Sequence, residues 1–397
     1  MAGRRRAWSI GAVGLVLLLP LAGCGGTPAD STRTEVQHLL DRRSAALLHH
    51  DETAYGATGA RTEYTRLRAL PLTSWRYRVT EVHRTGSGAT ADADLSYRVA
   101  GYDRAPVDAR RTLTLRRTAD GRWYVTADRA ARDAGQQLWD QGAVTAVKGA
   151  HSLVLGTGPT TAGLRGYARL ADRAVPAVSR VWGAGWARHV VVLVPRSLDG
   201  MAGLLGSPAA NYRGIAAVTT GEAGGSGQAP ADRVVVNPEA YAILGDLGKQ
   251  VVLTHETTHV ATRAQTTAAT PLWLSEGFAD WIGYLGTGRT PTEAAPELTR
   301  AVQDGHAPTA LPTDKDFGFT SAPAELARAY EGGWLACRMI AERWGTARLD
   351  AFYRAVGAHQ QRAGAVEEAL KKVLGTTTEA FTEQWREYVR EQLTPTE

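Results

Sequence analysis

The sequence predicts an α+β protein in two parts: helices with an antiparallel sheet, then a mixed sheet that leads into a mainly helical half. Three observations lead to this prediction. Apolar residues at helical spacing over residues 35–48 precede a series of β-rich segments that ends at residue 125. The continuous apolar run at 190–194 is typical of a buried strand. Beyond about Leu244 the pattern is mainly helical.

The first part is expected to be a small helix-and-sheet domain. Val36, Leu39 and Leu40 share one face of the first helix, and a second polar helical stretch follows. The β-rich segments come next, with a tight-turn signal before the last of them: 75–82, 89–99, 110–117 and 123–125. This order resembles the cone-shaped ketosteroid-isomerase-like fold over roughly residues 31–130. No paired acid or oxyanion donor marks an enzyme there, so the prediction is a spacer or a binding module.

The second part is expected to contain the mixed sheet. Residues 131–138 have the pattern of a connecting helix. The elements predicted after it are a strand at 143–155, a helix at 161–182 and strands at 190–194, 215–218 and 234–236. The segment 233–237 is predicted to be the edge that lines the substrate cleft. The run GEAGGSG at 221–227 is predicted to be a mobile loop between the last two strands.

The N-terminus has the pattern of an export signal. Arg4–Arg6 form a basic region, and the apolar run 10–21 is too short to span a bilayer. The sequence LAGC at 21–24 resembles a bacterial lipobox, in which Cys24 becomes the lipidated first residue after cleavage. The resemblance implies an extracytoplasmic protein, lipid-anchored to the cell membrane. An ordinary signal peptide with an incidental cysteine, or an uncleaved anchor, is the alternative.

About 370 residues would remain after processing, enough for two or three domains. The predicted division is a signal peptide with lipobox at 1–23, a tether at 24–31, the first α+β domain at 32–135 and a second domain at 136–397. No pattern in the sequence indicates an oligomeric state.

The composition argues against several classes of site. Cys24 and Cys337 are the only cysteines, so a cysteine-zinc site is excluded, and a lipidated Cys24 leaves no internal disulfide. Cys337 lies in an apolar helical run and is expected to be buried. The net charge is only +5 and no basic tract stands out beyond Arg4–Arg6, so nucleic-acid binding is not expected.

The run HETTH at 255–259 predicts a metal site with a hydrolytic base beside it. Histidines four residues apart on a helix project from the same face, so His255 and His259 can bind one cation. Glu256 follows the first histidine, where a base that activates water is needed. The motif alone also arises by chance, in roughly one chain in a hundred of this composition.

A second segment makes the site resemble a known family. HETTH followed by WLSEGFADW at 273–281 resembles the gluzincins, the peptidase-MA-like zinc metallopeptidases that include thermolysin and the aminopeptidase N group. The resemblance implies a zincin-type second domain and one Zn²⁺ per chain, held by His255, His259 and Glu276. It also implies that Asp280 accepts the free N–H of His255 and orients that ligand. A solvent-facing helix charge is the alternative for Asp280.

A third segment supplies a candidate for stabilising an oxyanion. The run AYEGGW at 329–334 resembles the tyrosine-bearing helix of the aminopeptidase N and leukotriene-hydrolase group. This resemblance implies that Tyr330 donates its O–H to the developing negative charge, and helix packing by Tyr330 is the alternative. That group also has a GxMEN sequence whose glutamate holds the substrate's free α-amine. No such sequence is present here, which favours an endopeptidase over an aminopeptidase.

The sequence therefore predicts a membrane-anchored, extracytoplasmic zinc metallopeptidase that acts on a peptide or protein substrate. Glu256 would take the proton of the attacking water and pass it to the leaving amine, and Tyr330 would help to stabilise the oxyanion. One alternative is a cell-surface binding or scaffold lipoprotein whose zinc-loaded domain has little activity. A non-peptide amide or ester substrate is another.

Overall fold

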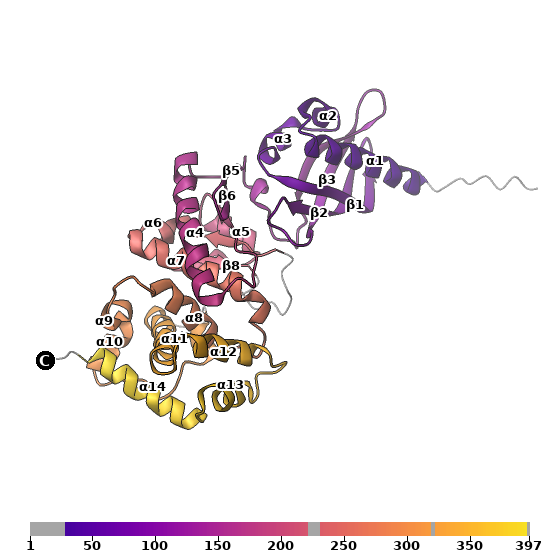
Figure 1. The fold of residues 1–397 in the computed structure, drawn as a ribbon. Helices are drawn as coiled ribbons and strands as arrows, with labels where there is room; N and C mark the ends of the chain where they lie inside the picture. The colour runs from indigo at the N-terminus through magenta and orange to yellow at the C-terminus, as the bar shows by residue number, and fades with distance from the viewer. Residues whose placement is uncertain (1–27, 221–230, 319–321, 395–397) are drawn as a thin grey trace, which may run out of the picture.

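The computed structural model describes residues 28–220, 231–318 and 322–394. These residues form two sheets with helices packed on each, followed by a mainly helical half (Figure 1), which confirms the predicted α+β class and the order of its parts. The expected signal peptide, Cys24 and the run 221–227 lie outside the described residues. Within the described ranges, no helix has the length and apolar character needed to cross a membrane.

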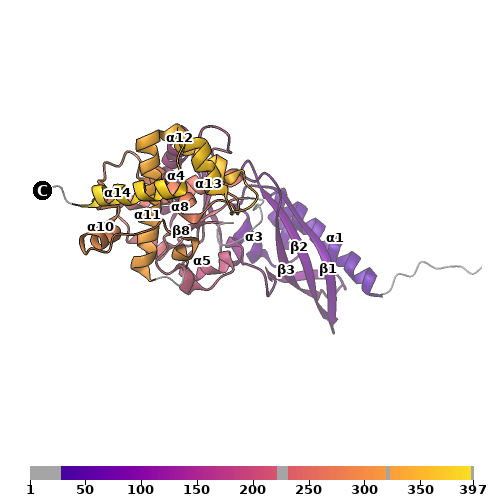
Figure 2. The same cartoon turned by 90° about the horizontal axis from the view of Figure 1, so that it is seen from below.

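The first sheet is an antiparallel meander in the order β1-β2-β3-β4. Its strands are β1 (Leu72–Thr85), β2 (Gly88–Val99), β3 (Val107–Arg117) and β4 (Trp123–Ala130). The helix α1 (Pro28–Leu48) lies along one face of this sheet (Figure 2), where alternate residues of the strands are buried against it. The short helices α2 (Glu52–Gly56) and α3 (Arg61–Leu67) connect α1 to β1.

Buried ion pairs fill the interior between this sheet and its helices. The Arg111 guanidinium donates hydrogen bonds to both carboxylate oxygens of Asp140, at 2.7 and 2.9 Å, and its Nε donates to Asp128 at 2.8 Å. Arg43 pairs with Glu63 nearby, and both arginines are almost fully buried. The cavity left among these groups measures about 10 Å³, the space of roughly one water.

The prediction of a connecting helix at 131–138 is wrong. The chain there forms turns, and only the short 3-10 turn Leu138–Asp140 is helical. The indole of Trp139 lies 5.1 Å, between ring centroids, from both Trp75 and Tyr97. These contacts with the first sheet override the local helical pattern.

The second sheet has the order β5-β6-β7-β9-β8. Its strands are β5 (Thr145–Lys148), β6 (Ser152–Gly156), β7 (Val190–Val194), β8 (Ala217–Thr219) and β9 (Val234–Val236). Strands β6, β7 and β9 are parallel, whereas β5 and β8 run antiparallel at the two edges. This is the predicted mixed sheet.

Two expectations for this sheet are wrong. The segment 143–155 is a hairpin of β5 and β6 rather than one strand, because the chain reverses after Lys148. The expected edge at 233–237 is interior, since β9 lies between β7 and β8, and β8 is the edge. Three consecutive valines, 234–236, are fully buried, as a strand covered on both faces requires.

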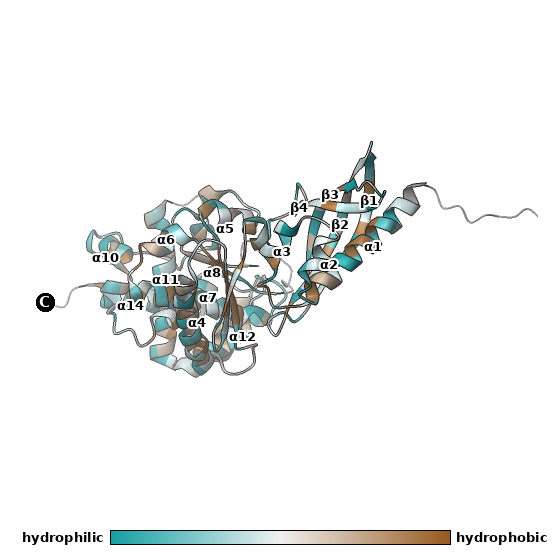
Figure 3. Cartoon of the chain, turned by 90° about the horizontal axis from the view of Figure 1, so that it is seen from above, coloured by the Kyte–Doolittle hydropathy of each residue, from teal (hydrophilic) through white to brown (hydrophobic). Residues whose placement is uncertain are grey.

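Helices form most of the rest of the chain. The helix α4 (Thr161–Trp182) has its predicted bounds and packs on β6. The others are α5 (Leu198–Leu205), α6 (Pro238–Ala242), α7 (Asp246–Thr262), α8 (Leu272–Tyr284), α9 (Pro291–Ala294), α10 (Pro296–Gln303), α11 (Pro323–Trp344), α12 (Thr346–Gly357), α13 (Ala365–Ala369) and α14 (Thr378–Leu393). The helices carry both hydrophilic and hydrophobic residues (Figure 3). Cys337 is buried inside α11 as expected.

The two parts of the molecule share a buried interface. Asp103, in the turn between β2 and β3, forms an ion pair of 2.7 Å with Arg233, which directly precedes β9. The Asp103 side chain is fully buried and that of Arg233 is 10% exposed. The Tyr102 hydroxyl donates to the backbone carbonyl of Ser152 at 3.0 Å, and residues of β6 and β7 belong to the hydrophobic cluster of the first part. The first sheet is therefore packed firmly against the second.

Helices α8 and α11 cross with their backbones in contact. A Cβ atom placed on Gly277 of α8 would lie 2.2 Å from the carbonyl oxygen of Gly333 in α11. A Cβ on Gly333 would lie 2.7 Å from the carbonyl oxygen of Trp273. Real Cβ atoms do not approach backbone this closely, so both positions require glycine.

We expect Gly277→Ala to lower the free energy of unfolding by about 1–3 kcal/mol or more, because the added methyl group forces the two backbones apart. Gly185→Ala is the matched control, since a Cβ there meets no atom within 4 Å. Thermal or urea unfolding of both variants measures the difference. Equal stability of the two variants would contradict the close crossing.

Candidate metal centre

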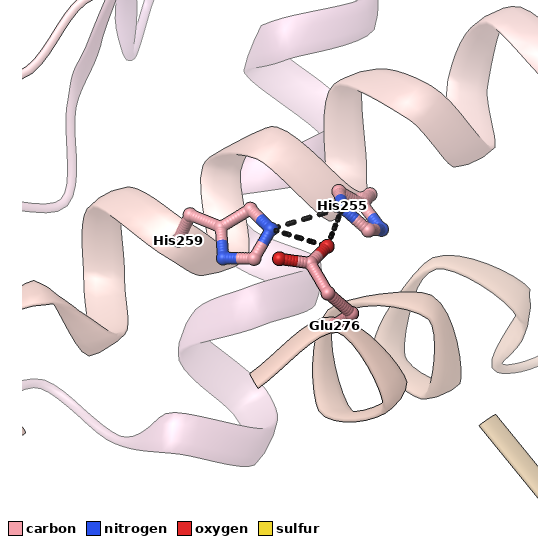
Figure 4. A group of neighbouring side chains, drawn as sticks. All are labelled: His255, His259 and Glu276. Carbon is pink, nitrogen blue, oxygen red and sulfur yellow. Dashed lines mark hydrogen bonds and ion pairs between the residues drawn. The ribbon is translucent and has the colours of Figure 1, made fainter. Parts of the chain in front are cut away.

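Three predicted ligands come together between two neighbouring helices (Figure 4). His255 and His259 lie one turn apart on α7, and Glu276 faces them from α8. The Nε2 atoms of the two histidines are 2.9 Å apart. Oε2 of Glu276 lies 3.2 Å from Nε2 of His255 and 3.4 Å from Nε2 of His259. All three side chains are at most 12% exposed.

The spacing of these three atoms fits a zinc ion. Zinc bonds of 2.0–2.1 Å in a tetrahedron separate neighbouring ligand atoms by about 3.3 Å. The observed separations of 2.9, 3.2 and 3.4 Å bracket that value. Two imidazole nitrogens and one carboxylate oxygen are also a donor set that binds zinc with one position left open.

Asp280 orients the first histidine. Its Oδ1 lies 2.7 Å from Nδ1 of His255, and an ionised carboxylate only accepts hydrogen bonds, so Nδ1 holds the proton. In the neutral imidazole this leaves the lone pair of Nε2 directed at the other two ligand atoms. The Asp280 side chain is 18% exposed, which argues against a solvent-facing charge.

The same contacts shift the pKa values of both groups. Burial lowers the pKa of His255, but the charge of Asp280 and hydrogen bonds to Asp280 and Glu276 outweigh it and raise that pKa to about 10. Burial raises the pKa of Glu276, but the two histidines outweigh burial and hold it well below its usual range. A cation that binds here must therefore displace a proton.

Glu256 is buried on the helix that carries the two histidines, and its residue is 5% exposed. Its Oε2 accepts a hydrogen bond of 2.6 Å from the hydroxyl of Thr219, the last residue of β8. No sequence pattern points to Thr219, because the contact joins residues 37 positions apart.

A cleft of about 730 Å³ opens beside these groups and is lined by His255, Glu256, Asp280 and Tyr330. Much of the remaining wall is apolar and comes from the segment before β8, from α7 and from α11: Ala210, Gly214, Ile215, Ala216, Ala217, Val251, Val252, Leu326, Ala327 and Trp334. The cleft is of a size typical of sites that bind small molecules or short peptide segments.

Tyr330 projects from α11 into this cleft. Its ring centroid lies 6.4 Å from that of His255 and 5.1 Å from that of Phe317. The structure therefore brings Tyr330 together with the three potential ligands, although the two segments are about seventy residues apart in sequence.

The neighbouring Glu331 has a structural contact that the sequence did not reveal. Its carboxylate accepts backbone hydrogen bonds from Leu298 at 2.6 Å and from Glu297 at 3.2 Å, at the N-terminus of α10. Burial raises the pKa of Glu331 to about 7, although these two bonds act to lower it. Glu331 thus ties α11 to α10 next to the cleft.

A second group of possible ligands lies on the first sheet. Nε2 of His83 is 3.5 Å from Glu81 and 4.0 Å from Asp92. All three side chains are about half exposed, and exposed acidic groups commonly occur without a cation. The side chains of this second group are exposed, whereas those of His255, His259 and Glu276 are buried.

No protein-family model matches the chain, and no curated protein matches it. Some solved structures are similar. A variant of the M1 zinc metallopeptidase from Deinococcus radiodurans, bound to a Tyr-Ser-Ala substrate, aligns with 78% of this chain and 62% of its own length, at 16% identity and a TM-score of 0.36. Native yeast LTA4 hydrolase aligns with 71% of this chain and 44% of its own, at 12% identity and a TM-score of 0.36. The chain thus spans less than two thirds of either structure. Because both TM-scores are below 0.5, only the geometry of this chain bears on the roles of its site residues.

The contacts of Glu331 predict a pH dependence of stability. Its folded pKa of about 7 is above the ordinary value of 4.5, so its stabilising contribution is full below pH 4.5 and is lost as the pH rises through 7. Between pH 5 and pH 8 the natural protein should lose on the order of 2 kcal/mol of unfolding free energy relative to Glu331→Gln. Urea unfolding at both pH values measures this difference, and identical pH profiles would refute it.

Proposed function

We propose that this chain is a zinc-dependent metallopeptidase that hydrolyses peptide bonds with an activated water. The observation that carries the proposal is the convergence of His255, His259 and Glu276 at tetrahedral spacing beside a cleft that Glu256 and Tyr330 also line. Burying two imidazoles and a carboxylate together is costly unless the groups are paired with one another or bind an ion.

In this proposal His255, His259 and Glu276 hold one zinc ion per chain, and Asp280 keeps His255 in the ligating tautomer. When bound, zinc polarises the scissile carbonyl and lowers the pKa of water towards about 7. Glu256 takes the proton of the attacking water and then delivers it to the leaving amine. Tyr330 donates its O–H to the carbonyl oxygen as negative charge develops there, an effect worth about 10²–10³ in rate.

The contacts of the cleft support an endopeptidase. An aminopeptidase needs an unengaged carboxylate to hold the substrate's α-amine. Among the described residues that line the cleft, Asp280 is engaged with His255, Glu331 with the N-terminus of α10, and Glu293 with Arg289 and Thr290. The wall formed by the segment before β8 contributes no carboxylate. Among the described lining residues, the proposed base Glu256 is therefore the one carboxylate without such a structural engagement to another part of the cleft wall.

We further propose that the protein acts outside the cytoplasm, anchored through a lipidated Cys24. The support is the pattern of the first 24 residues, a basic region and a short apolar run that end at a lipobox-like LAGC. The substrate would then be a peptide or protein at the cell surface.

The rival proposal is a cell-surface scaffold that binds zinc without turnover. Metal analysis of the purified soluble part, with a chelator-sensitive digest of a peptide library, separates the two. One zinc per chain with chelator-sensitive cleavage supports the enzyme. One zinc per chain with no cleavage of any peptide supports the scaffold.

Three substitutions test the proposed roles in the same assay. Glu256→Gln should retain zinc and lose hydrolysis, because it removes the base but no ligand. His259→Ala should lose both zinc and hydrolysis. Tyr330→Phe should retain zinc and lower kcat by about 10²–10³. Full peptidase activity in Glu256→Gln would overturn the assignment of the base.

Removal of the proposed lipidation site should release the protein. Cys24→Ser leaves no thiol for acylation, so the variant is expected in the soluble fraction, whereas the natural protein stays with membranes. Fractionation and the mass of the mature N-terminus measure this. Equal membrane association of both proteins would contradict the anchor.

A further inference from the structure

The hydroxyl of Thr219 lies against the carboxylate of Glu256 and is fully buried, at 0% exposure. It is 2.6 Å from Oε2 of Glu256 and 3.1 Å from the backbone carbonyl oxygen of the same residue. A threonine hydroxyl has a single proton to donate. The shorter distance and the charge of the carboxylate favour donation to Oε2.

We propose that Thr219 is a positioning residue for the catalytic base. This inference rests on the proposed function. Because Thr219 holds Oε2, the carboxylate of Glu256 presents its remaining lone pairs to the water from one fixed position. Since Thr219 is fully buried, bulk water does not replace its hydrogen bond. The side chain of Glu256 is thus held in one rotamer before substrate arrives, and a misplacement of about 1 Å costs roughly 10²-fold in rate.

Two further contacts hold Thr219 itself in place. It pairs with Val234 in the ladder between β8 and β9. Just beyond it, the backbone carbonyl of Thr220 accepts a hydrogen bond of 2.6 Å from Nη2 of Arg263, at the C-terminal end of α7. The Nε of Arg263 also pairs with Asp232 at 2.8 Å.

The edge strand and the helix of the base are therefore cross-linked at two points, through Thr219 and through Arg263. The sheet edge fixes the donor, and α7 fixes the acceptor. A purely structural threonine would need only the bond to the backbone carbonyl, which does not involve the carboxylate of Glu256.

The test compares Thr219→Val with Thr219→Ser. Valine keeps the shape of threonine and removes the hydroxyl, whereas serine keeps the hydroxyl. Thr219→Val should lower kcat about 10–100-fold with KM within about threefold of the natural value, and Thr219→Ser should restore kcat to within about threefold. The control is Thr299→Val, because Thr299 is also buried but its hydroxyl donates to the helix carbonyl of Ala295 on α10. Zinc content should match among all four proteins, and each should unfold in one cooperative transition above the assay temperature.

A crystal structure of Thr219→Val supplies a second readout that does not depend on activity. The carboxylate of Glu256 should leave its position or occupy several rotamers, while His255, His259 and Glu276 stay in place. An unmoved Glu256, a kcat equal to that of the natural protein, or equal loss in the serine and valine variants would each overturn the proposal.

The outcomes also separate this inference from the proposed function. If the natural protein cleaves no peptide, the peptidase assignment fails, and the crystal structure alone decides the role of Thr219. If Thr219→Val does not fold, Thr219→Ala replaces it in the comparison with serine.

Discussion

The crossing of α8 and α11 is the constraint on which the site depends. Because neither Gly277 nor Gly333 has a side chain, the two helices touch through backbone atoms. That contact sets the separation between Glu276, one residue before the first glycine, and Tyr330, three residues before the second. Any larger residue at the crossing would move the phenol away from the potential ligands. The glycines in SEGFADW and YEGGW thus act through helix packing rather than through flexibility.

The charges around the site explain why a divalent cation suits it. With neutral imidazoles, the buried cluster of Glu256, Glu276 and Asp280 around His255 and His259 would contain three negative charges and no positive one. Such a cluster is costly to bury. A proton on His255, whose pKa is raised to about 10, offsets one of these charges. A doubly charged ion offsets two and occupies the point to which the three ligand atoms already converge.

The sequence predicted what depends on local spacing and missed what depends on neighbours far along the chain. Periodicity predicts the helix at 161–182. The HETTH and WLSEGFADW motifs predict His255, His259 and Glu276 as ligands, and the structure brings the three together. Sheet order does not follow from periodicity, so the apolar run at 234–236 predicts a strand but not its interior place between β7 and β8. Thr219 and Glu331 were missed for a related reason. Each acts through a side-chain bond to an element more than thirty residues away.

The buried pair of Asp103 and Arg233 has a consequence for how the chain can be divided. A fragment that begins at residue 136 would retain Arg233 without its counter-ion and would uncover the apolar side chains of β6 and β7 that the first part now shields. The exposed apolar area would carry the main cost, at about 25 cal/mol per Å², since Arg233 itself would become hydrated. The two parts therefore stabilise each other through this interface, and a fragment cut at residue 136 is expected to be less stable than the intact chain.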